Sequence, residues 1–247
     1  VMDGGSTDGS VDIIQRYEDR LAYWQSEPDG GQTDAIRQGF ERATGDILWW
    51  LNSDDLYEPD TLFEVAEHFS ANPTDRFIYG DATWIDATGD VIKPKREHRF
   101  NAFVWFWDHN FIPQPSSFWR RDLYEQVGGL DPSFNLAMDA DLWIRFSEIT
   151  RPRHISRPWS RMRFYPAQKN TALRDESLEE MRRIRVRHGQ TATGLDAAIR
   201  GRLARLVRLG LKATEGGYTA KEVGAHLGSA IAGKTWEERE SDRSGRR

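Results

Sequence analysis

Short apolar segments alternate with amphipathic segments over the first fifty residues, and this alternation restricts the fold more than any other feature of the sequence. Strand-like segments are predicted at 1–2, 21–25 and 47–51, and helix-like segments at 10–17 and 36–43. Strands that alternate with helices at such short spacing favour a mainly parallel sheet covered by helices. The sequence therefore predicts an α/β fold.

The alternation continues to about residue 165. The turn "ATGD" joins two strand-like segments into a predicted hairpin, and two consecutive glycines end a short predicted helix. Pro158 lies in the last strand-like segment, which is therefore predicted to be an edge strand, because proline cannot donate to a central ladder. The further predicted elements are helix 62–69, strands 76–86 and 91–97, helices 121–129 and 139–149, and strand 154–165.

Composition excludes several classes of protein. The 34 basic and 39 acidic side chains give a net charge of −5, so no overall field attracts nucleic acid, and no nucleic-acid partner is predicted. The absence of cysteine excludes disulfides and thiolate metal sites. The sequence contains neither an apolar run of ~20 residues nor a signal-peptide pattern. We expect a cytoplasmic protein.

Polar turns follow two of the predicted strands at their carboxyl ends, where ligands bind in doubly wound sheets. One turn is "DGGSTDGS", residues 3–10, and the other is "NSDD", residues 52–55. The adjacent carboxylates Asp54 and Asp55 repel each other unless a cation neutralises them, and Mg²⁺ binds one or two carboxylates together with substrate phosphates. A nucleotide diphosphate with a divalent cation would fit these turns. The alternative is that both are structural turns capping the helices that follow.

A third acidic pair lies in "NLAMDADLWIRF". Asp139 and Asp141 lie at a predicted helix start, where the helix dipole stabilises carboxylates and carboxylates cap free amides. Asp139 could instead serve as a general base facing a hydroxyl group. Spacing alone leaves both interpretations open.

Four segments in this order resemble the family-2 glycosyltransferases, inverting nucleotide-sugar enzymes of the GT-A fold. They are "VMDGGSTDGS", "SEPDGGQTDAIRQGFERATGDILWWLNSDD", "IPQPSSFWRRDLYEQVGGLDPSF" and "MDADLWIRF". The resemblance implies a Rossmann-like sheet with flanking helices and a nucleotide-diphosphate sugar as donor. It implies that Asp54 and Asp55 hold Mg²⁺ or Mn²⁺, that Asp139 is the catalytic base and that Asp141 supports it. The nucleotide-binding residues that it implies are Asp3, Gly4, Gly5, Asp34 and Asp54.

Several positions depart from the family's pattern. Gly4 stands where the family often has a second aspartate, and Asn52 holds the first place of the acidic motif. Tyr165 stands where a histidine is common, so Arg163, Tyr165 and Lys169 are alternatives for contact with the diphosphate.

The resemblance divides the chain into parts. Residues 1–171 would form the transferase domain, with a nucleotide-sugar half at about 1–90 and an acceptor half at about 91–171. A helical extension is predicted at 172–235 and a disordered tail at 236–247. The family's first strand and helix would precede the first residue of this sequence, so we expect a fragment of a longer, bacterial protein.

The acceptor is expected to be a glycan or a lipid-linked molecule with a free hydroxyl group. Aromatic residues crowd the segment 100–119, which is interpreted as core in preference to a sugar-stacking groove. Gln114, Ser116 and Ser117 follow it and are predicted to hydrogen-bond the acceptor. The basic, amphipathic helix 197–213 is interpreted as packing on the domain, with peripheral contact to the inner face of a membrane as the alternative.

The sequence therefore predicts a metal-dependent inverting glycosyltransferase, with a role in cell-surface polysaccharide or glycan synthesis that rests on the resemblance alone. One rival is a catalytically silent nucleotide-binding subunit of the same fold. A second rival is a sugar nucleotidyltransferase, but such enzymes usually carry a glycine-rich basic phosphate loop near the start, and none is visible.

Overall fold

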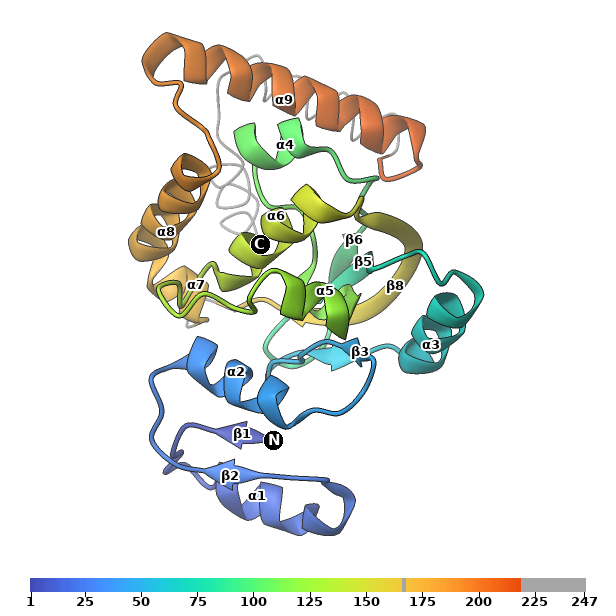
Figure 1. Ribbon diagram of the computed structural model, residues 1–247, viewed down its shortest axis with the longest axis vertical. Helices are drawn as coiled ribbons and strands as arrows, with labels where there is room; N and C mark the ends of the chain where they lie inside the picture. Colours follow the sequence, from blue (N-terminus) through green and yellow to red (C-terminus); the bar gives the residue numbers. More distant parts are fainter. Residues whose placement is uncertain (166–167, 219–247) are drawn as a thin grey trace.

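The computed structural model describes residues 1–165 and 168–218, and it confirms an α/β architecture (Figure 1). The strands are β1 (Met2–Asp3), β2 (Gln25–Ser26), β3 (Ile47–Leu48), β4 (Leu56–Tyr57), β5 (Phe77–Ile85), β6 (Val91–Lys95), β7 (Ser117–Arg120) and β8 (Arg153–Arg163). The helices are α1 (Ser10–Arg16), α2 (Gln32–Arg42), α3 (Thr61–Ala71), α4 (Ala102–Trp107), α5 (Arg121–Gln126), α6 (Met138–Ile149), α7 (Lys169–Ala172), α8 (Arg174–Arg187) and α9 (Gly194–Thr214). Two 3₁₀ turns complete the described chain, η1 (Glu18–Arg20) and η2 (Gln114–Ser116). The predicted tail 236–247 lies outside the described residues.

The strands form a small sheet and a large one. β1 and β2 pair in parallel, and the large sheet has the order β3-β7-β5-β8-β4, with β6 paired to β5. The long ladder between β5 and β8 is parallel, whereas the remaining ladders of the large sheet are antiparallel. The prediction of a mainly parallel sheet is therefore correct for β1–β2 and β5–β8 only. β4, β6 and β7 run antiparallel to their neighbours, and the predicted hairpin of β5 and β6 already indicated one of these reversals.

Within the part of the chain that the structure describes, no ladder joins the two sheets, since β1 pairs with β2 and β3 pairs with β7. β1, β2 and α1 form a small lobe (lowest part of Figure 1), on which α2 packs through β1. The apolar run 47–51 accordingly makes a strand of two residues rather than five, and Leu51 at its end is exposed. The expectation that a further strand and helix precede Val1 stays a prediction.

The predicted edge strand is instead an interior strand. β8 lies between β5 and β4, and Pro158 is accommodated where the β5–β8 register shifts around Asp81. A bulge leaves a residue outside the regular ladder, which removes the cost of the missing N–H of proline. Gly80 permits the same irregularity, because a Cβ atom there would lie 2.6 Å from the ring of Trp159.

Aromatic side chains fill the core beneath the large sheet. Trp143 of α6 stacks on Phe77 of β5 with ring centroids 4.8 Å apart, and it meets Trp119 edge to face at 5.2 Å. Trp105 and Phe111 from the aromatic run 100–119 are fully buried. The interpretation of that run as core is therefore confirmed.

The predicted extension beyond residue 171 shares this core, as far as residue 218. Ile184 of α8 and Leu211 of α9 belong to the same apolar cluster as Trp143, and α9 packs on α4 (Figure 1). If the predicted basic face of α9 pointed outward, Arg208 and Lys212 would be exposed, but the helix is turned the other way. Its Arg208 and Lys212 are buried, whereas an apolar stripe faces outward that contains Leu195, Ile199, Leu203 and Leu206. Arg208 and Lys212 therefore point into the domain, whereas Arg200 and Arg202 remain exposed.

Among the described residues, no helix combines the length and the apolar character needed to cross a lipid bilayer.

Candidate functional site

Two cavities adjoin the carboxyl ends of the apolar strands. The first, of about 1120 Å³, extends from the gap between β1 and β3 to the acidic turn at Asp54 and Asp55. The second, of about 760 Å³, lies between the large sheet, the start of α6 and the inner face of α9. Asp55, Asn52, Gln32 and Trp50 border both cavities.

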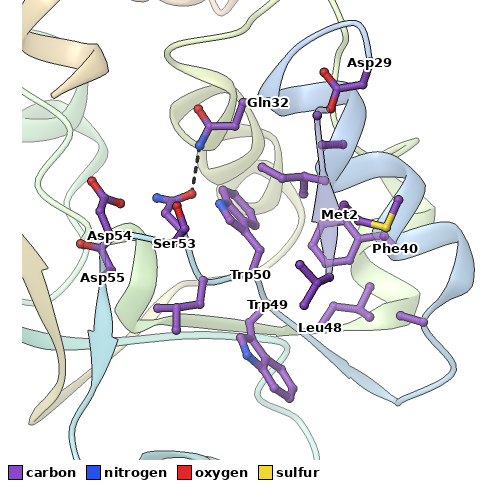
Figure 2. A pocket seen from close by; sticks show the side chains of 18 of the residues that line it. Met2, Asp29, Gln32, Phe40, Leu48, Trp49, Trp50, Ser53, Asp54 and Asp55 are labelled. Carbon is purple, nitrogen blue, oxygen red and sulfur yellow. Dashed lines mark hydrogen bonds between the residues drawn. The ribbon is translucent and has the colours of Figure 1, made fainter. Parts of the chain in front are cut away.

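The first cavity is apolar at one end and acidic at the other. Figure 2 shows Met2 and Phe40 at the apolar end and Asp54 and Asp55 at the opposite end, with Trp50 between them. An apolar wall that leads to a few convergent polar groups is the usual composition of a small-molecule site.

The two adjacent aspartates differ in exposure. Asp55 is buried and its Oδ1 accepts a hydrogen bond from the backbone N–H of Arg163, whereas the half-buried Asp54 receives one from the Tyr165 hydroxyl group at 3.3 Å. Burial, reinforced by the neighbouring charge of Asp54, raises the pKa of Asp55 to about 6. A cation bound here would remove that penalty.

The neutral Asn52 at the start of the acidic motif organises the turn. Its Oδ1 accepts a hydrogen bond from Gln32 at 2.9 Å (Figure 2), and its Nδ2 donates one to Gln114 at 3.0 Å. Gln114 in turn donates to the backbone carbonyl of Trp50. Asn52 therefore connects the start of α2 to the floor of the second cavity.

The residues expected to hold a nucleoside are tied into local turns. The Asp3 carboxylate accepts hydrogen bonds from Ser26 and from the backbone of Gly5 and Ser6, and these bonds, Ser26 foremost, lower the pKa of Asp3 to about 2. Gly5 has a φ of 86°, which glycine adopts without strain. Asp34 accepts bonds from the N–H of Gly30 and from Gln38. Of the predicted nucleotide-binding residues, Gly4 and Asp54 border the first cavity, whereas Asp3, Gly5 and Asp34 do not, so a nucleotide-binding role for these three stays a prediction.

Of the three alternatives for contact with a diphosphate, two border the first cavity. Lys169 donates to Gln32 and to the carbonyl of Asn135, both at more than 3.1 Å, and Tyr165 contacts Asp54. Arg163 instead donates to the backbone carbonyls of Asp54, Asp86 and Ala87. Its guanidinium group therefore braces the acidic turn.

Asp139 borders the second cavity, at the start of α6. Its Oδ2 accepts a long hydrogen bond of 3.4 Å from Asn110, and burial raises the pKa of Asp139 to about 6, with a further contribution from Glu180. A carboxylate with a raised pKa that contacts a cavity has the properties of a general base. Because Asp55 borders the same cavity, the structure brings the two predicted sites together.

Asp141 lies on the opposite side of α6 from the cavity. It is fully buried and receives a hydrogen bond of 2.8 Å from Arg145 Nε, and Arg145 Nη2 forms an ion pair with the same oxygen at 2.6 Å. Arg187 approaches its other oxygen to 3.5 Å. Asp141 therefore fixes α6 in place, and its role in supporting Asp139 stays a prediction.

Two of the predicted acceptor residues are also inaccessible. Ser116 and Ser117 are buried, and their hydroxyl groups bond to the carbonyls of Asp81 and Pro113. They are the last two residues of the motif "PQPSS", where the turn η2 leads into β7, and the interior position of β7 between β3 and β5 buries them. Gln114 does border the second cavity.

Glu180 of α8 is a site residue that the sequence did not indicate. Its carboxylate accepts hydrogen bonds of 2.8–3.1 Å from the backbone N–H groups of Asn135, Leu136 and Ala137, directly before α6. An anion at this position satisfies the free amides of a helix start. The partners are more than forty residues apart in sequence, so no local pattern could reveal the contact.

The acidic turn fits a divalent cation that a nucleotide would help to bind. Among the described residues there is no group of three or more histidine, cysteine or carboxylate side chains that could hold a metal ion by itself. Asp54 and Asp55 nevertheless offer hard oxygen donors, and Mg²⁺ or Mn²⁺ completes its coordination with phosphate oxygens and water.

Comparison with known proteins agrees with this geometry. The family model described as "Glycosyl transferase family 2" matches residues 1–128. An uncharacterized glycosyltransferase of Mycobacterium tuberculosis is 32% identical over 153 residues, which are 62% of this chain and 58% of that protein. A "PGL/p-HBAD biosynthesis glycosyltransferase" of Mycobacterium bovis is 31% identical over 167 residues, covering 63% and 61%. The chain thus spans about three-fifths of these relatives.

Among solved structures, the mannosyltransferase PcManGT of Pyrobaculum calidifontis, in complex with GDP-Man and Mn²⁺, has the same fold. It superposes with a TM-score of 0.55 at 17% identity, over 98% of this chain and 68% of that one. The family match covers more than half of the present sequence, and it includes the glycine-rich turn and the acidic turn. The chain belongs to glycosyl transferase family 2.

Proposed function

We propose that this protein transfers a sugar, with inversion, from a nucleotide-diphosphate sugar to a hydroxyl group of a glycan or lipid-linked acceptor in the synthesis of cell-surface glycans. The observation that carries the proposal is the shared cavity. Asp55 of the acidic turn and Asp139 at the start of α6 border the same space, and each has a raised pKa. The relatives named "PGL/p-HBAD biosynthesis glycosyltransferase" and "O-antigen biosynthesis protein RfbC" support the assignment to glycan synthesis.

In this proposal the donor binds in the first cavity and the acceptor binds in the second. The nucleoside would occupy the first cavity, beside Gly4 and Gln32, with its diphosphate at Asp54 and Lys169. The acceptor would enter the second cavity, beside Gln114 and Asn110. The sugar of the donor would then lie between them, where Asn52 and Asp55 border both spaces.

Asp139 is the proposed general base. Its carboxylate accepts the proton of the acceptor hydroxyl group as the hydroxyl oxygen bonds to the anomeric carbon, and the bond from that carbon to the diphosphate breaks. Asn110, which donates to Asp139 Oδ2, orients the carboxylate. Attack from the side opposite to the diphosphate inverts the anomeric centre.

Asp54 and Asp55 would hold a divalent cation together with the diphosphate oxygens. The cation, when bound, offsets the negative charge that develops on the diphosphate. The Mn²⁺ in the complex of the mannosyltransferase supports this choice of metal. Lys169 would add a positive charge on the other side of the diphosphate.

The proposal is tested by calorimetric titration of UDP, GDP, TDP and CDP in the presence of Mn²⁺ and again with EDTA. One nucleotide should bind, and EDTA should weaken the binding at least about tenfold, because two charge-assisted contacts disappear. Asp55→Asn should have the same effect as EDTA. Asp60→Asn is the matched control, since Asp60 lies at the start of α3 and borders neither cavity.

Two results would contradict the proposal. Nucleotide binding that is unchanged by EDTA and by Asp55→Asn would remove the metal role. Failure of every nucleotide to bind the folded protein would favour the silent-subunit alternative.

A further inference from the structure

Three side-chain amides form a hydrogen-bonded chain at the junction of the two cavities. Gln32 donates from Nε2 to Asn52 Oδ1 at 2.9 Å (Figure 2), and Asn52 donates from Nδ2 to Gln114 Oε1 at 3.0 Å. Gln114 donates from Nε2 to the backbone carbonyl of Trp50 at 2.8 Å. At the opposite end, Lys169 Nζ donates to Gln32 Oε1 at 3.3 Å. We call Gln32, Asn52 and Gln114 the amide chain.

The two ends of the amide chain fix the direction of its hydrogen bonds. The ammonium group of Lys169 can only donate, and the backbone carbonyl of Trp50 can only accept. Each amide between them must therefore accept at its oxygen on the lysine side and donate from its nitrogen on the Trp50 side. If one amide were turned over, two acceptors would face each other at one contact and two donors at the next.

This direction explains why residue 52 is an asparagine. An aspartate has the same size, but its ionised carboxylate only accepts hydrogen bonds, so it would set an oxygen against Gln114 Oε1. Gln114 cannot turn over to relieve that contact, because it is buried and its nitrogen is held by the carbonyl of Trp50. The amide chain therefore requires a neutral amide at the first place of the acidic motif.

The amide chain also joins the two groups that the proposed function sets beside the diphosphate. At one end, the exposed Lys169 contacts the chain through Gln32. In the middle, the backbone carbonyl of Asn52 accepts a hydrogen bond from the N–H of Asp55 at 3.2 Å, which closes the acidic turn. Gln32 and Asn52 border both cavities. The separation between the lysine and the acidic turn therefore depends on these two amides.

We infer that Gln32 and Asn52 are positioning residues of the diphosphate site, and that they hold Lys169 and the acidic turn on either side of the diphosphate. This inference rests on the proposed function, and it gives a role to the asparagine that departs from the family's acidic motif. Gln32 acts through Lys169, and Asn52 acts through Asp55. In this role neither amide contacts the reacting atoms.

The first test uses Gln32→Met, which keeps the length of the side chain and removes its hydrogen bonds without adding charge. Binding of pyrophosphate, and of UDP, GDP, TDP and CDP, is measured by calorimetry with Mg²⁺ at constant ionic strength. Gln32→Met should weaken binding of the diphosphates roughly tenfold, because a displaced Lys169 loses a charge-assisted contact. Gln126→Met is the matched control, since Gln126 is exposed at the end of α5 and borders neither cavity.

A double-mutant cycle shows whether Gln32 acts through Lys169. Lys169→Met alone should weaken diphosphate binding by at least the same factor. In the Lys169→Met background, Gln32→Met should then add less than about twofold, because the group that it positions is already absent. The full tenfold loss in both backgrounds would show a purely structural role of Gln32 and would overturn the inference.

Asn52→Asp distinguishes the amide chain from a third metal ligand. If residue 52 were a vacant ligand position, the added carboxylate should tighten binding of pyrophosphate with Mg²⁺. The amide chain predicts the opposite result, a loss of at least about tenfold that higher Mg²⁺ does not restore. Asn52→Leu removes the same hydrogen bonds without adding charge and should also weaken binding. It replaces Asn52→Asp if that variant does not fold, and Gln126→Glu is the control for the added charge.

The outcomes separate this inference from the proposed function. Nucleotide binding that neither Gln32→Met nor Asn52→Leu alters would overturn the inference and leave the proposed function intact. Pyrophosphate binding that depends on Gln32 and Lys169, without binding of any nucleotide, would support the diphosphate site and contradict a nucleotide-sugar donor. Absence of pyrophosphate and nucleotide binding in the folded wild-type protein would overturn both.

Discussion

Burial makes ionisation of both Asp55 and Asp139 unfavourable, and we propose a different role for each carboxyl group. Asp55 is buried beside another aspartate, so the proposed divalent cation would stabilise its charged form. Asp139 contacts Asn110 and lies near Glu180, so its charged form has no strong cationic partner within the described residues and remains basic. The same pKa of about 6 is therefore compatible with the proposed metal binding by Asp55 and with the proposed proton transfer to Asp139.

The raised pKa of Asp139 predicts the pH dependence of transfer. A base must be deprotonated to act, so kcat/KM should fall about tenfold for each pH unit below about 6 and level off above pH 7. Asp139→Asn should lower the rate by about 10²- to 10⁴-fold and leave nucleotide binding intact. The rate is measured as release of the nucleoside diphosphate between pH 4.5 and 8. Turnover of the variant at the wild-type rate would refute the role of Asp139 as base.

Asp55 and Asp139 could be proposed from the sequence because each lies at a recognisable end of a strand-like or helix-like segment. Asp55 comes after an apolar run and Asp139 comes at a helix start, and such positions are defined locally. Ser116 and Ser117 were misassigned because their burial depends on the place of β7 between β3 and β5, which is set by long-range pairing. The orientation of α9 was equally hidden, since helical spacing separates two faces without telling which one turns inward.

At the scale of elements, one carboxylate of α8 holds the segment that leads into α6. Glu180 binds three successive backbone N–H groups, of Asn135, Leu136 and Ala137, and thereby fixes the segment that leads to Asp139. Asn135 also contacts Thr33 at the start of α2, and a Cβ atom at Gly31 would lie 2.6 Å from its side chain. The starts of α2 and α6 are thus held together by close contacts.

Glu180→Gln is expected to act through Asp139. Loss of the charge should lower the pKa of Asp139 and shift the acidic limb of the pH profile downward, and the loosened segment should lower kcat roughly 10- to 100-fold. Nucleotide affinity should be unchanged. Glu179→Gln is the control, because Glu179 is exposed and pairs with Arg182 on the same helix. A pH profile identical to that of the wild type would show that Glu180 has a purely structural role.

At the scale of the whole molecule, the two sheets should differ in local stability. The β1–β2 sheet has two short strands, whereas β5 is paired along its length and its Phe77, Ile78 and Tyr79 are fully buried. Local opening is easiest where few apolar contacts hold the backbone.

Amide hydrogen exchange measured by mass spectrometry should therefore reveal the difference. The amides of β1 and β2 should exchange at least about 100-fold faster than those of β5, because their opening requires only the small lobe to loosen. The unbound protein is the appropriate sample, since a bound nucleotide would contact the small lobe at Gly4. Equal protection of both sheets would indicate that they open as one unit.

One indole connects the two cavities. Trp50 borders both of them, stacks on Trp143 with centroids 5.9 Å apart and meets Trp119 at 5.6 Å. Because Trp50 adjoins both cavities, we expect tryptophan fluorescence to change when a ligand enters either of them. Binding could then be followed without an added label.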